Sequence, residues 1–251
     1  MVSARAVRPP PALVCRLYSE DKADGERDFA ALEQIVRGML RLIEERSKSN
    51  HIECKPVGRG ISGPCWKSAR SKDLGVRQKR MTLLKEIATE LARGHVVFFH
   101  VDGDCTWAET KRAPVWAELK RFCDGLRDLA VHKQIGKLDQ SMLADAFIAV
   151  IPFYSMESWI YACTERLCTR TSNAKDLERI AEWAADLGTL DEVRYIKDAL
   201  SIGDQCNHEL AGHVPAAALC AAGKSYAATV ERVRGSSRIE AGLAETLQRD
   251  W

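Results

Sequence analysis

The stretch Val96-Val-Phe-Phe-His-Val-Asp-Gly-Asp104 decides the fold of this chain. Its first six residues form a bounded run rich in β-branched and aromatic side chains, which is typical of a strand buried on both faces. Two aspartates separated by a glycine follow at once. Because open α/β sheets bind ligands beyond the carboxyl ends of their strands, this stretch predicts a buried parallel strand that ends at a functional site.

Three further runs favour strands, at residues 12–18, 51–57 and 146–151. Between the runs, apolar residues recur at helical spacing in segments 29–43, 84–91 and 115–129. Gly94 is expected to stop the second of these helices, and Pro114 lies near the start of the third. Strands that alternate with helices imply right-handed crossovers. The sequence therefore predicts an α/β fold with a mainly parallel sheet flanked by helices.

The C-terminal third of the chain has a different pattern. Beyond about residue 170 the strand signal disappears, and two groups of apolar residues favour helices. The first group is Leu177, Ile180, Ala184 and Leu187, and the second is Val193, Ile196 and Leu200. We expect an α-helical C-terminal extension.

Composition excludes several classes of protein. With 251 residues, of which 46% are hydrophobic and 29% charged, the chain can bury a full core. A net charge of +2 gives no global attraction to nucleic acid or membranes, so any such binding needs a local patch. The nine cysteines contain no Cys-x-x-Cys pair and suit an intracellular protein with reduced thiols. Since no apolar run is long enough for a signal or a membrane span, we expect a cytoplasmic protein with no membrane contact.

Asp102 and Asp104 are the first candidate for chemistry. Two carboxylates two residues apart beyond a strand can turn toward one point, and Gly103 would let the backbone approach it closely. A hard cation such as Mg²⁺ or Mn²⁺ would remove their mutual repulsion. The alternative is an ordinary surface Asp-Gly turn. A hairpin is disfavoured, because the residues after Asp104 do not resume a strand.

Two glutamates are candidates to complete this site. Glu20 ends the first strand, and parallel strands place their carboxyl ends at the same edge, so Glu20 can face Asp102 and Asp104. Glu157 follows the fourth strand and falls in an expected first helical turn, with Ser155 as the expected cap. Favourable interaction with the helix dipole alone explains an acid at that position equally well.

Together these motifs resemble a TOPRIM-type catalytic domain, the module of topoisomerases, primases and OLD-type nucleases, in the variant of small bacterial defence proteins. The resemblance rests on Leu17-Tyr-Ser-Glu20, Val101-Asp-Gly-Asp104 and the later Glu-Ser-Trp159, and it spans residues 12–165. It implies a TOPRIM or Rossmann-like domain at 12–165 followed by the helical extension at 166–251. The chain departs from the family in having Asp21 where a glycine usually follows the glutamate.

The resemblance implies Mg²⁺-dependent cleavage of DNA or RNA in anti-phage defence. In such a nuclease Asp102 and Asp104 would hold the cation, while Glu20 would activate water or bind a second metal, with Glu157 as a further candidate ligand. A polynucleotide also needs cationic contacts to its phosphates. The candidate contacts are Lys67, Arg70, Lys72, Arg77, Lys79 and Arg80, which follow a Gly-rich loop, and also Lys111 and Arg112.

Other interpretations stay open. Asp102-Gly-Asp-Cys-Thr106 also fits the Asp-x-Asp-x-Thr motif of haloacid-dehalogenase-type phosphatases, although that motif usually opens the domain. A third possibility is a non-catalytic TOPRIM-like subunit that docks an ATPase or sensor protein. The chain could also assemble as a homo-oligomer. Ala222-Gly-Lys-Ser225 is similar to the end of a phosphate-binding loop, but it lacks the first glycine and a preceding strand.

Overall fold

The computed structural model describes residues 11–20, 27–45, 51–57, 63–67, 71–103, 114–133, 140–202 and 207–249. Strands and helices alternate as far as β4, and only helices and 3₁₀ turns follow in the part that is described. In chain order the elements are β1 (Leu13–Ser19), α1 (Arg27–Ile43), β2 (Ile52–Pro56), α2 (Gly63–Lys67), α3 (Leu74–Ala92), β3 (Val96–His100), α4 (Pro114–Lys133), α5 (Gln140–Ala146), β4 (Phe147–Val150), α6 (Glu157–Ile160), α7 (Thr164–Cys168), α8 (Ala174–Ala185), η2 (Leu187–Glu192), η3 (Ile196–Asp198), α9 (Asn207–Ala211), α10 (Ala216–Ala221), α11 (Ser225–Arg234) and α12 (Ser237–Arg249).

The four strands form one all-parallel sheet in the order β2-β1-β3-β4. β1 pairs with β2 on one side, where Cys15 lies opposite Cys54, and with β3 on the other, where Ser19 lies opposite His100. β3 also pairs with β4. Each strand lies within one residue of its expected range. The predicted α/β class with a mainly parallel sheet is confirmed.

Both faces of the sheet are buried, which explains why the strands are continuous apolar runs. Alternate side chains point to opposite faces, so neighbours in one strand belong to different hydrophobic cores. Leu17 and Phe98 contribute to one core, and Tyr18 and Phe99 to the other. Every residue of β3 is buried, as expected for a central strand.

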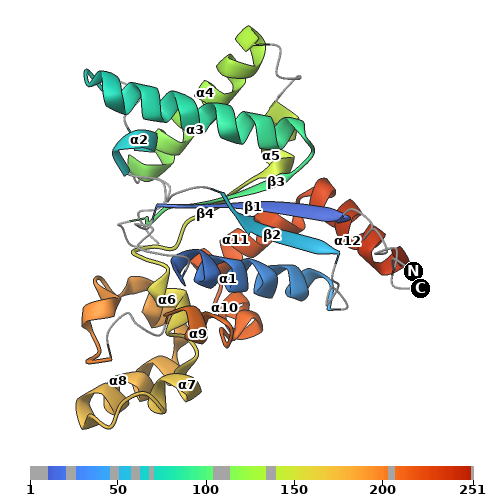
Figure 1. The fold of residues 1–251 in the computed structure, drawn as a ribbon. Helices are drawn as coiled ribbons and strands as arrows, with labels where there is room; N and C mark the ends of the chain where they lie inside the picture. Colours follow the sequence, from blue (N-terminus) through green and yellow to red (C-terminus); the bar gives the residue numbers. More distant parts are fainter. Residues whose placement is uncertain are drawn as a thin grey trace, which may run out of the picture.

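Helices cover the sheet on both sides and give the molecule three layers (Figure 1). In the view of Figure 1, helices α2 to α5 lie above the sheet, and α1, α10 and α11 lie below it. Contacts between α3 and β3 and between α5 and β4 anchor the upper layer, while α1 packs on β1 and β2, and α11 packs on β4.

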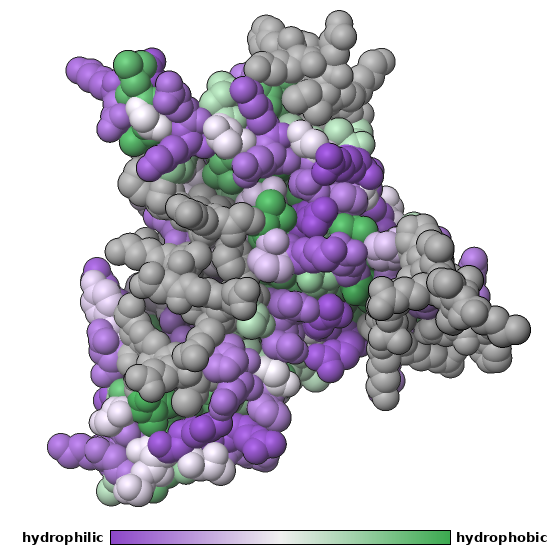
Figure 2. Space-filling model, viewed as in Figure 1, coloured by the Kyte–Doolittle hydropathy of each residue, from purple (hydrophilic) through white to green (hydrophobic). Residues whose placement is uncertain are grey.

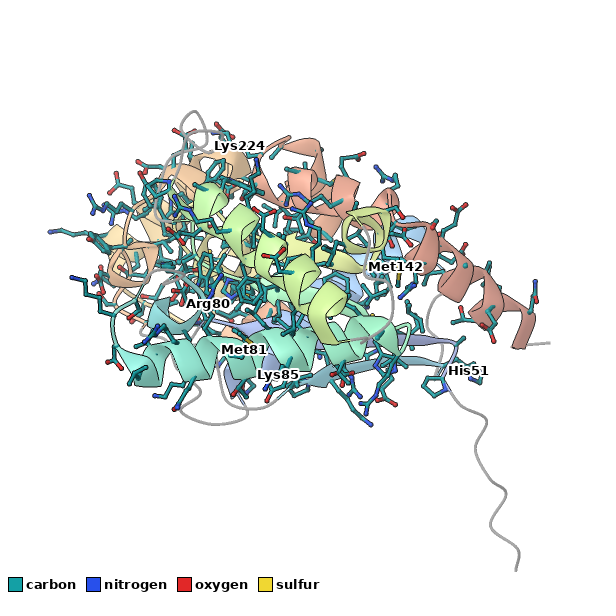
Figure 3. All side chains as sticks on the ribbon, turned by 90° about the horizontal axis from the view of Figure 1, so that it is seen from above. His51, Arg80, Met81, Lys85, Met142 and Lys224 are labelled. Carbon is teal, nitrogen blue, oxygen red and sulfur yellow. The ribbon has the colours of Figure 1, made fainter. Side chains whose placement is uncertain are left out.

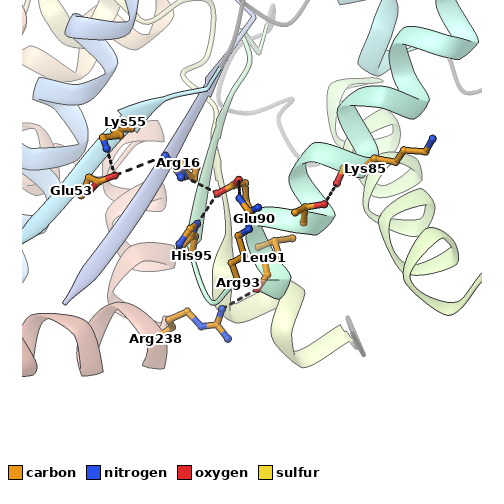
Figure 4. Close-up of polar contacts among 10 residues, drawn as sticks. Arg16, Glu53, Lys55, Lys85, Glu90, Leu91, Arg93, His95 and Arg238 are labelled. Atoms are coloured by element: carbon orange, nitrogen blue, oxygen red, sulfur yellow. Dashed lines mark hydrogen bonds and ion pairs between the residues drawn. The ribbon is translucent and has the colours of Figure 1, made fainter. Parts of the chain in front are cut away.

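A charged network fastens α3 to the sheet (Figure 4). The Glu90 carboxylate accepts hydrogen bonds from Arg16 Nε at 2.7 Å and lies 2.6 Å from His95 Nδ1. Arg16 also reaches Glu53, which pairs with Lys55. Burial works to raise the pKa of Glu90, but the hydrogen bonds from His95 and Arg16 outweigh it and leave this pKa below its usual value.

Helix α3 begins ten residues before the apolar pattern predicts. The Asp73 side chain caps it by accepting hydrogen bonds from the backbone N–H groups of Gly75 and Val76. Its first turns are mostly exposed, so regular apolar spacing starts only near Leu84, where the helix packs against the core. At the other end Gly94 has a φ of 86°, which agrees with the predicted stop after α3.

The C-terminal segment is helical in its described parts and is packed closely onto the sheet. Residues on both sides of position 165 share one core, and α12 approaches β1 so closely that a Cβ at Gly242 would lie 3.0 Å from Leu13 Cβ. The expected helix through Val193, Ile196 and Leu200 is wrong. Val193 follows η2, Ile196 begins η3 and Leu200 lies beyond η3, and the chain turns sharply at Tyr195, which has a φ of 56°.

The expected side-chain cap at Ser155 is also wrong. Helix α6 has Met156 at its N-cap position, and no side chain caps it. Ser155 contributes only its backbone carbonyl, which accepts a hydrogen bond from Ser158 Oγ at 2.8 Å.

Candidate functional site

The order of the strands singles out one place on the edge of the sheet. The chain steps from β1 to β2 on one side and later crosses to β3 on the other side, so the winding direction reverses at β1. In open α/β sheets such a switch point leaves a crevice beyond the carboxyl ends of the two neighbouring strands. Glu20 directly follows β1, and Asp102 follows β3 after one intervening residue, so both candidate acids flank this place.

Glu20 is held by both its backbone and its side chain. Its N–H donates to the carbonyl of His100 at 3.0 Å, which extends the pairing of β1 with β3. Its Oε1 lies 3.1 Å from Lys67 Nζ, and that ammonium also stands over the Trp66 ring. The second oxygen, Oε2, is buried and accepts no hydrogen bond from any residue that the structure describes.

Asp102, like Glu20, has one carboxylate oxygen that is buried in the protein. Its Oδ1 is buried, and within the described part of the chain no donor satisfies it at hydrogen-bond distance. His100 Nε2 lies 3.5 Å from this oxygen. The side chain as a whole is 29% exposed, so the other end of the carboxylate remains open to solvent or a ligand.

Two residues that the sequence analysis did not single out complete the site. His100 is fully buried, and its Nδ1 lies 2.9 Å from Ser19 Oγ, which is 1% exposed. The signal available in the sequence was a histidine near the end of an otherwise apolar strand. Ser19, His100 and Asp102 thus form a chain of polar contacts from the sheet interior to its carboxyl edge.

Gly103 has a different role from the one expected. A Cβ at this position would lie 2.3 Å from the carbonyl oxygen of Phe153 and 2.4 Å from that of Pro152. The N–H of Gly103 donates to the Pro152 carbonyl at 3.1 Å. Glycine is therefore needed because the segment after β3 runs against the segment after β4, and this contact fixes the backbone beside Asp102.

Several predicted residues lie outside the described residues. These are Asp104 of the Asp-Gly-Asp motif and the basic residues Arg70, Lys111 and Arg112.

Glu157 begins helix α6, which follows β4, but its side chain contacts a different part of the molecule. Its Oε1 accepts a hydrogen bond from Asn207 Nδ2 of α9 at 3.3 Å. No group of three or more His, Cys, Asp or Glu side chains that could hold one metal ion is found among the residues described. Within that part of the chain, Glu157 therefore does not complete a metal cluster with Glu20 and Asp102.

The predicted phosphate-contacting residues separate into exposed and buried ones. Lys72, Arg77 and Lys79 are exposed at the amino-terminal end of α3. Figure 2 shows hydrophilic and hydrophobic residues side by side at this end of the molecule, where Leu74 is 66% exposed. Lys67 is engaged with Glu20.

Arg80 instead points between α3 and α4, as Figure 3 shows. It is 7% exposed, its guanidinium donates to the carbonyls of Trp66 and Arg121, and it lies over the Phe122 ring. Burial lowers the pKa of Arg80. This side chain joins α2, α3 and α4, so its position does not suit the predicted contact with a phosphate.

In the stretch 222–225, which is similar to the end of a phosphate-binding loop, a side chain of the protein takes the position that a phosphate would need. At the start of α11 the Asp191 carboxylate accepts hydrogen bonds from Ser225 N at 3.0 Å and Ser225 Oγ at 2.8 Å. Lys224 forms an ion pair with Glu192 at 2.7 Å. An internal carboxylate thus takes the place that a phosphate would need, which agrees with the weak sequence match.

No protein-family model, curated protein or solved structure matches this chain. Among the described helices, none combines the length and apolar character needed to cross a membrane.

Proposed function

We propose that this chain is a metal-dependent nuclease whose site lies at the carboxyl edge of the sheet and includes Glu20, Asp102 and Asp104. The observation that carries the proposal is the pair of buried carboxylate oxygens, Glu20 Oε2 and Asp102 Oδ1, that lack a hydrogen-bond donor among the described residues. Buried anionic oxygens without donors are costly to the fold. Such oxygens at a switch point favour a function over a structural role.

The donor set suits Mg²⁺ or Mn²⁺. Both ions prefer carboxylate oxygens, and a cation would stabilise the two acids where the protein supplies few partners. Asp102 would bind the ion, and Asp104 of the same motif would be the second ligand, as the TOPRIM resemblance implies. Glu157, which contacts Asn207, is the weakest of the predicted ligands.

A bound cation would polarise the phosphate and stabilise the charge that develops on its oxygens. The residues of the chain supply the rest of the chemistry. Lys67 orients one oxygen of Glu20, so the other can accept a proton from an attacking water. His100 and Gly103 fix the surroundings of Asp102 from the side chain and the backbone respectively.

A nucleic-acid substrate is favoured by the charge near this edge. Because α2 and α3 connect β2 with the parallel strand β3, α3 runs back along the sheet and its first turns lie at the carboxyl ends of the strands. Lys72, Arg77 and Lys79 are exposed there, and no described acidic residue forms an ion pair with them. Cations without an ion-pair partner among the described residues, beside the proposed metal site, suit a polyanionic substrate.

The proposed biological role rests on the TOPRIM resemblance alone. That resemblance implies that the protein acts in bacterial anti-phage defence, in the cytoplasm, with an ATPase or sensor protein as its partner.

The test uses plasmid DNA, tRNA and p-nitrophenyl phosphate, each with Mn²⁺, Mg²⁺ or EDTA. We expect cleavage of a polynucleotide only with metal, and a loss of at least about 100-fold in Glu20→Gln and Asp102→Asn. Glu165→Gln, which changes an exposed acid on α7, is the matched control and should keep full activity.

Three results would contradict the metal-dependent nuclease. Hydrolysis of the monoester alone would assign a phosphatase to the same aspartates. Cleavage of a polynucleotide that persists in EDTA would overturn the role of the metal, and no cleavage of any substrate by the wild type would favour a non-catalytic subunit.

A further inference from the structure

The contacts of His100 raise the question of why a histidine lies inside the sheet. Its ring is fully buried, in a strand whose other residues are all apolar. Burying a polar ring is unfavourable unless its nitrogens find partners. One nitrogen faces Ser19 Oγ at 2.9 Å, and the other faces Asp102 Oδ1 at 3.5 Å.

The chemistry of these partners determines which nitrogen carries the proton. An ionised carboxylate can only accept hydrogen bonds, so the nitrogen that faces Asp102 must carry a proton for the contact to be favourable. In the neutral ring the proton is then on Nε2, and Nδ1 accepts a hydrogen bond from the Ser19 hydroxyl. Ser19 thereby selects the form of His100 that directs an N–H toward Asp102.

The backbone of the same residue positions the other acid. The His100 carbonyl accepts the N–H of Glu20 at 3.0 Å, and Ser19 and His100 are register partners in the β1–β3 pair. One residue in the middle of the sheet therefore contacts Glu20 through its carbonyl and Asp102 through its ring.

We propose that His100 is a positioning residue that, together with Ser19, holds the Asp102 carboxylate in the orientation in which it binds a divalent cation. This inference rests on the proposed function. At 3.5 Å the contact is longer than an ordinary hydrogen bond, so it favours one orientation of the carboxylate and leaves its oxygens able to bind a cation. Partners behind a metal ligand commonly control metal affinity in this way.

The experiment measures Mn²⁺ affinity of the full chain by calorimetry, without nucleic acid, for five proteins besides the wild type. Asp102→Asn tests the ligand, His100→Leu removes the ring contacts, and His100→Gln keeps an N–H group near the place of Nε2. Ser19→Ala removes the partner that selects the tautomer. His95→Gln changes a histidine of the Glu90 network and is the matched control.

We expect His100→Leu to weaken Mn²⁺ binding about 10–100-fold and Ser19→Ala to weaken it about tenfold. His100→Gln should bind close to the wild-type affinity, and His95→Gln should be unchanged. If His100 merely filled space, the His100→Leu and His100→Gln variants would bind Mn²⁺ with equal affinity. Long-range ¹H–¹⁵N spectra of the metal-free wild type should show a proton on Nε2 of His100.

The possible failures can be told apart. If the wild type binds no Mn²⁺, or if Asp102→Asn binds it equally well, both the proposed function and this inference are overturned. If Asp102→Asn loses binding while the His100 and Ser19 variants keep it, only the inference is overturned. Circular dichroism checks folding, and should His100→Leu fail to fold, unchanged affinity in Ser19→Ala or an Nε2 without a proton still overturns the inference.

Discussion

Asp102 and Asp191 are both acids with a buried oxygen, but the protein treats them in opposite ways. Asp191 is 5% exposed and accepts hydrogen bonds from Ser158, Trp159 and Ser225, so each of its oxygens has a donor. Asp102 has one buried oxygen with no donor at hydrogen-bond distance among the described residues.

This contrast separates an acid that builds the fold from one that is the proposed ligand of a cation. The contacts of Asp191 tie η2 to α6 and to the first turn of α11, so they hold the helical part of the chain together. Burial raises the pKa of Asp191, and the hydrogen bonds from Ser225, Ser158 and Trp159 oppose that rise. Asp102 has no comparable set of donors among the described residues, which suits its proposed role as a metal ligand.

The largest expected effect tests this contrast directly. Asp191→Ala removes the acceptor of the buried Ser225 N–H and hydroxyl and one of the two acceptors of Trp159 Nε1, so we expect it to lower the free energy of unfolding by about 3 kcal/mol or more. Asp102→Asn should change it by less than about 0.5 kcal/mol, because that carboxylate has few partners to lose. Urea denaturation of both variants measures the difference. Equal destabilisation by the two substitutions would break the comparison.

A middle-sized effect comes from a third acid, Glu90, whose partners include Arg16 and His95. In Glu90→Gln we expect a loss of about 1–2 kcal/mol of stability at pH 7, since the charged hydrogen bonds to Arg16 and His95 weaken. The folded-state pKa of Glu90 is lowered, so its contribution is present above the unfolded value of 4.5 and is lost as the pH falls through the folded value.

The stability difference between wild type and Glu90→Gln should therefore stay constant from pH 7 down to about pH 5 and shrink as the pH falls below the unfolded value of 4.5. Urea denaturation across this range measures it, with Glu178→Gln, an exposed acid on α8, as the control. A difference that stays constant with pH would show that Glu90 acts by packing and not by charge.

The smallest expected effect concerns exposed basic residues at the start of α3 and in the helical part of the chain. Changing Lys72, Arg77 and Lys79 to Ala should make the plot of log affinity against log salt concentration less steep. The change in slope should correspond to the loss of about two to three phosphate contacts. The same triple change at Arg166, Lys175 and Arg234, in the helical part that contains Asp191, should leave the slope unaltered. Fluorescence anisotropy in EDTA measures both. Equal slopes for the two triple variants would place the nucleic-acid contact elsewhere.

Some parts of the site could be predicted from sequence because they depend on where strands end. Glu20 and Asp102 follow strands whose carboxyl ends a parallel sheet brings to the same edge, as the sequence predicts, and the strand order additionally makes these two strands neighbours. Arg80 could not be assigned in this way. It stands between the exposed Lys79 and Met81, and only the packing of α2 and α4 around α3 decides that its side chain is buried.

The sequence by itself determined the alternation of strands and helices and the acids that follow the strands, because hydrophobic periodicity is a local property of the chain. The tertiary structure alone decided which carboxylates are satisfied. The partner of His100 lies 81 residues away at Ser19, and a partner of Asp191 lies 34 residues away at Ser225. Burial and hydrogen-bond donors of this kind arise from contacts between distant segments, which no local pattern contains.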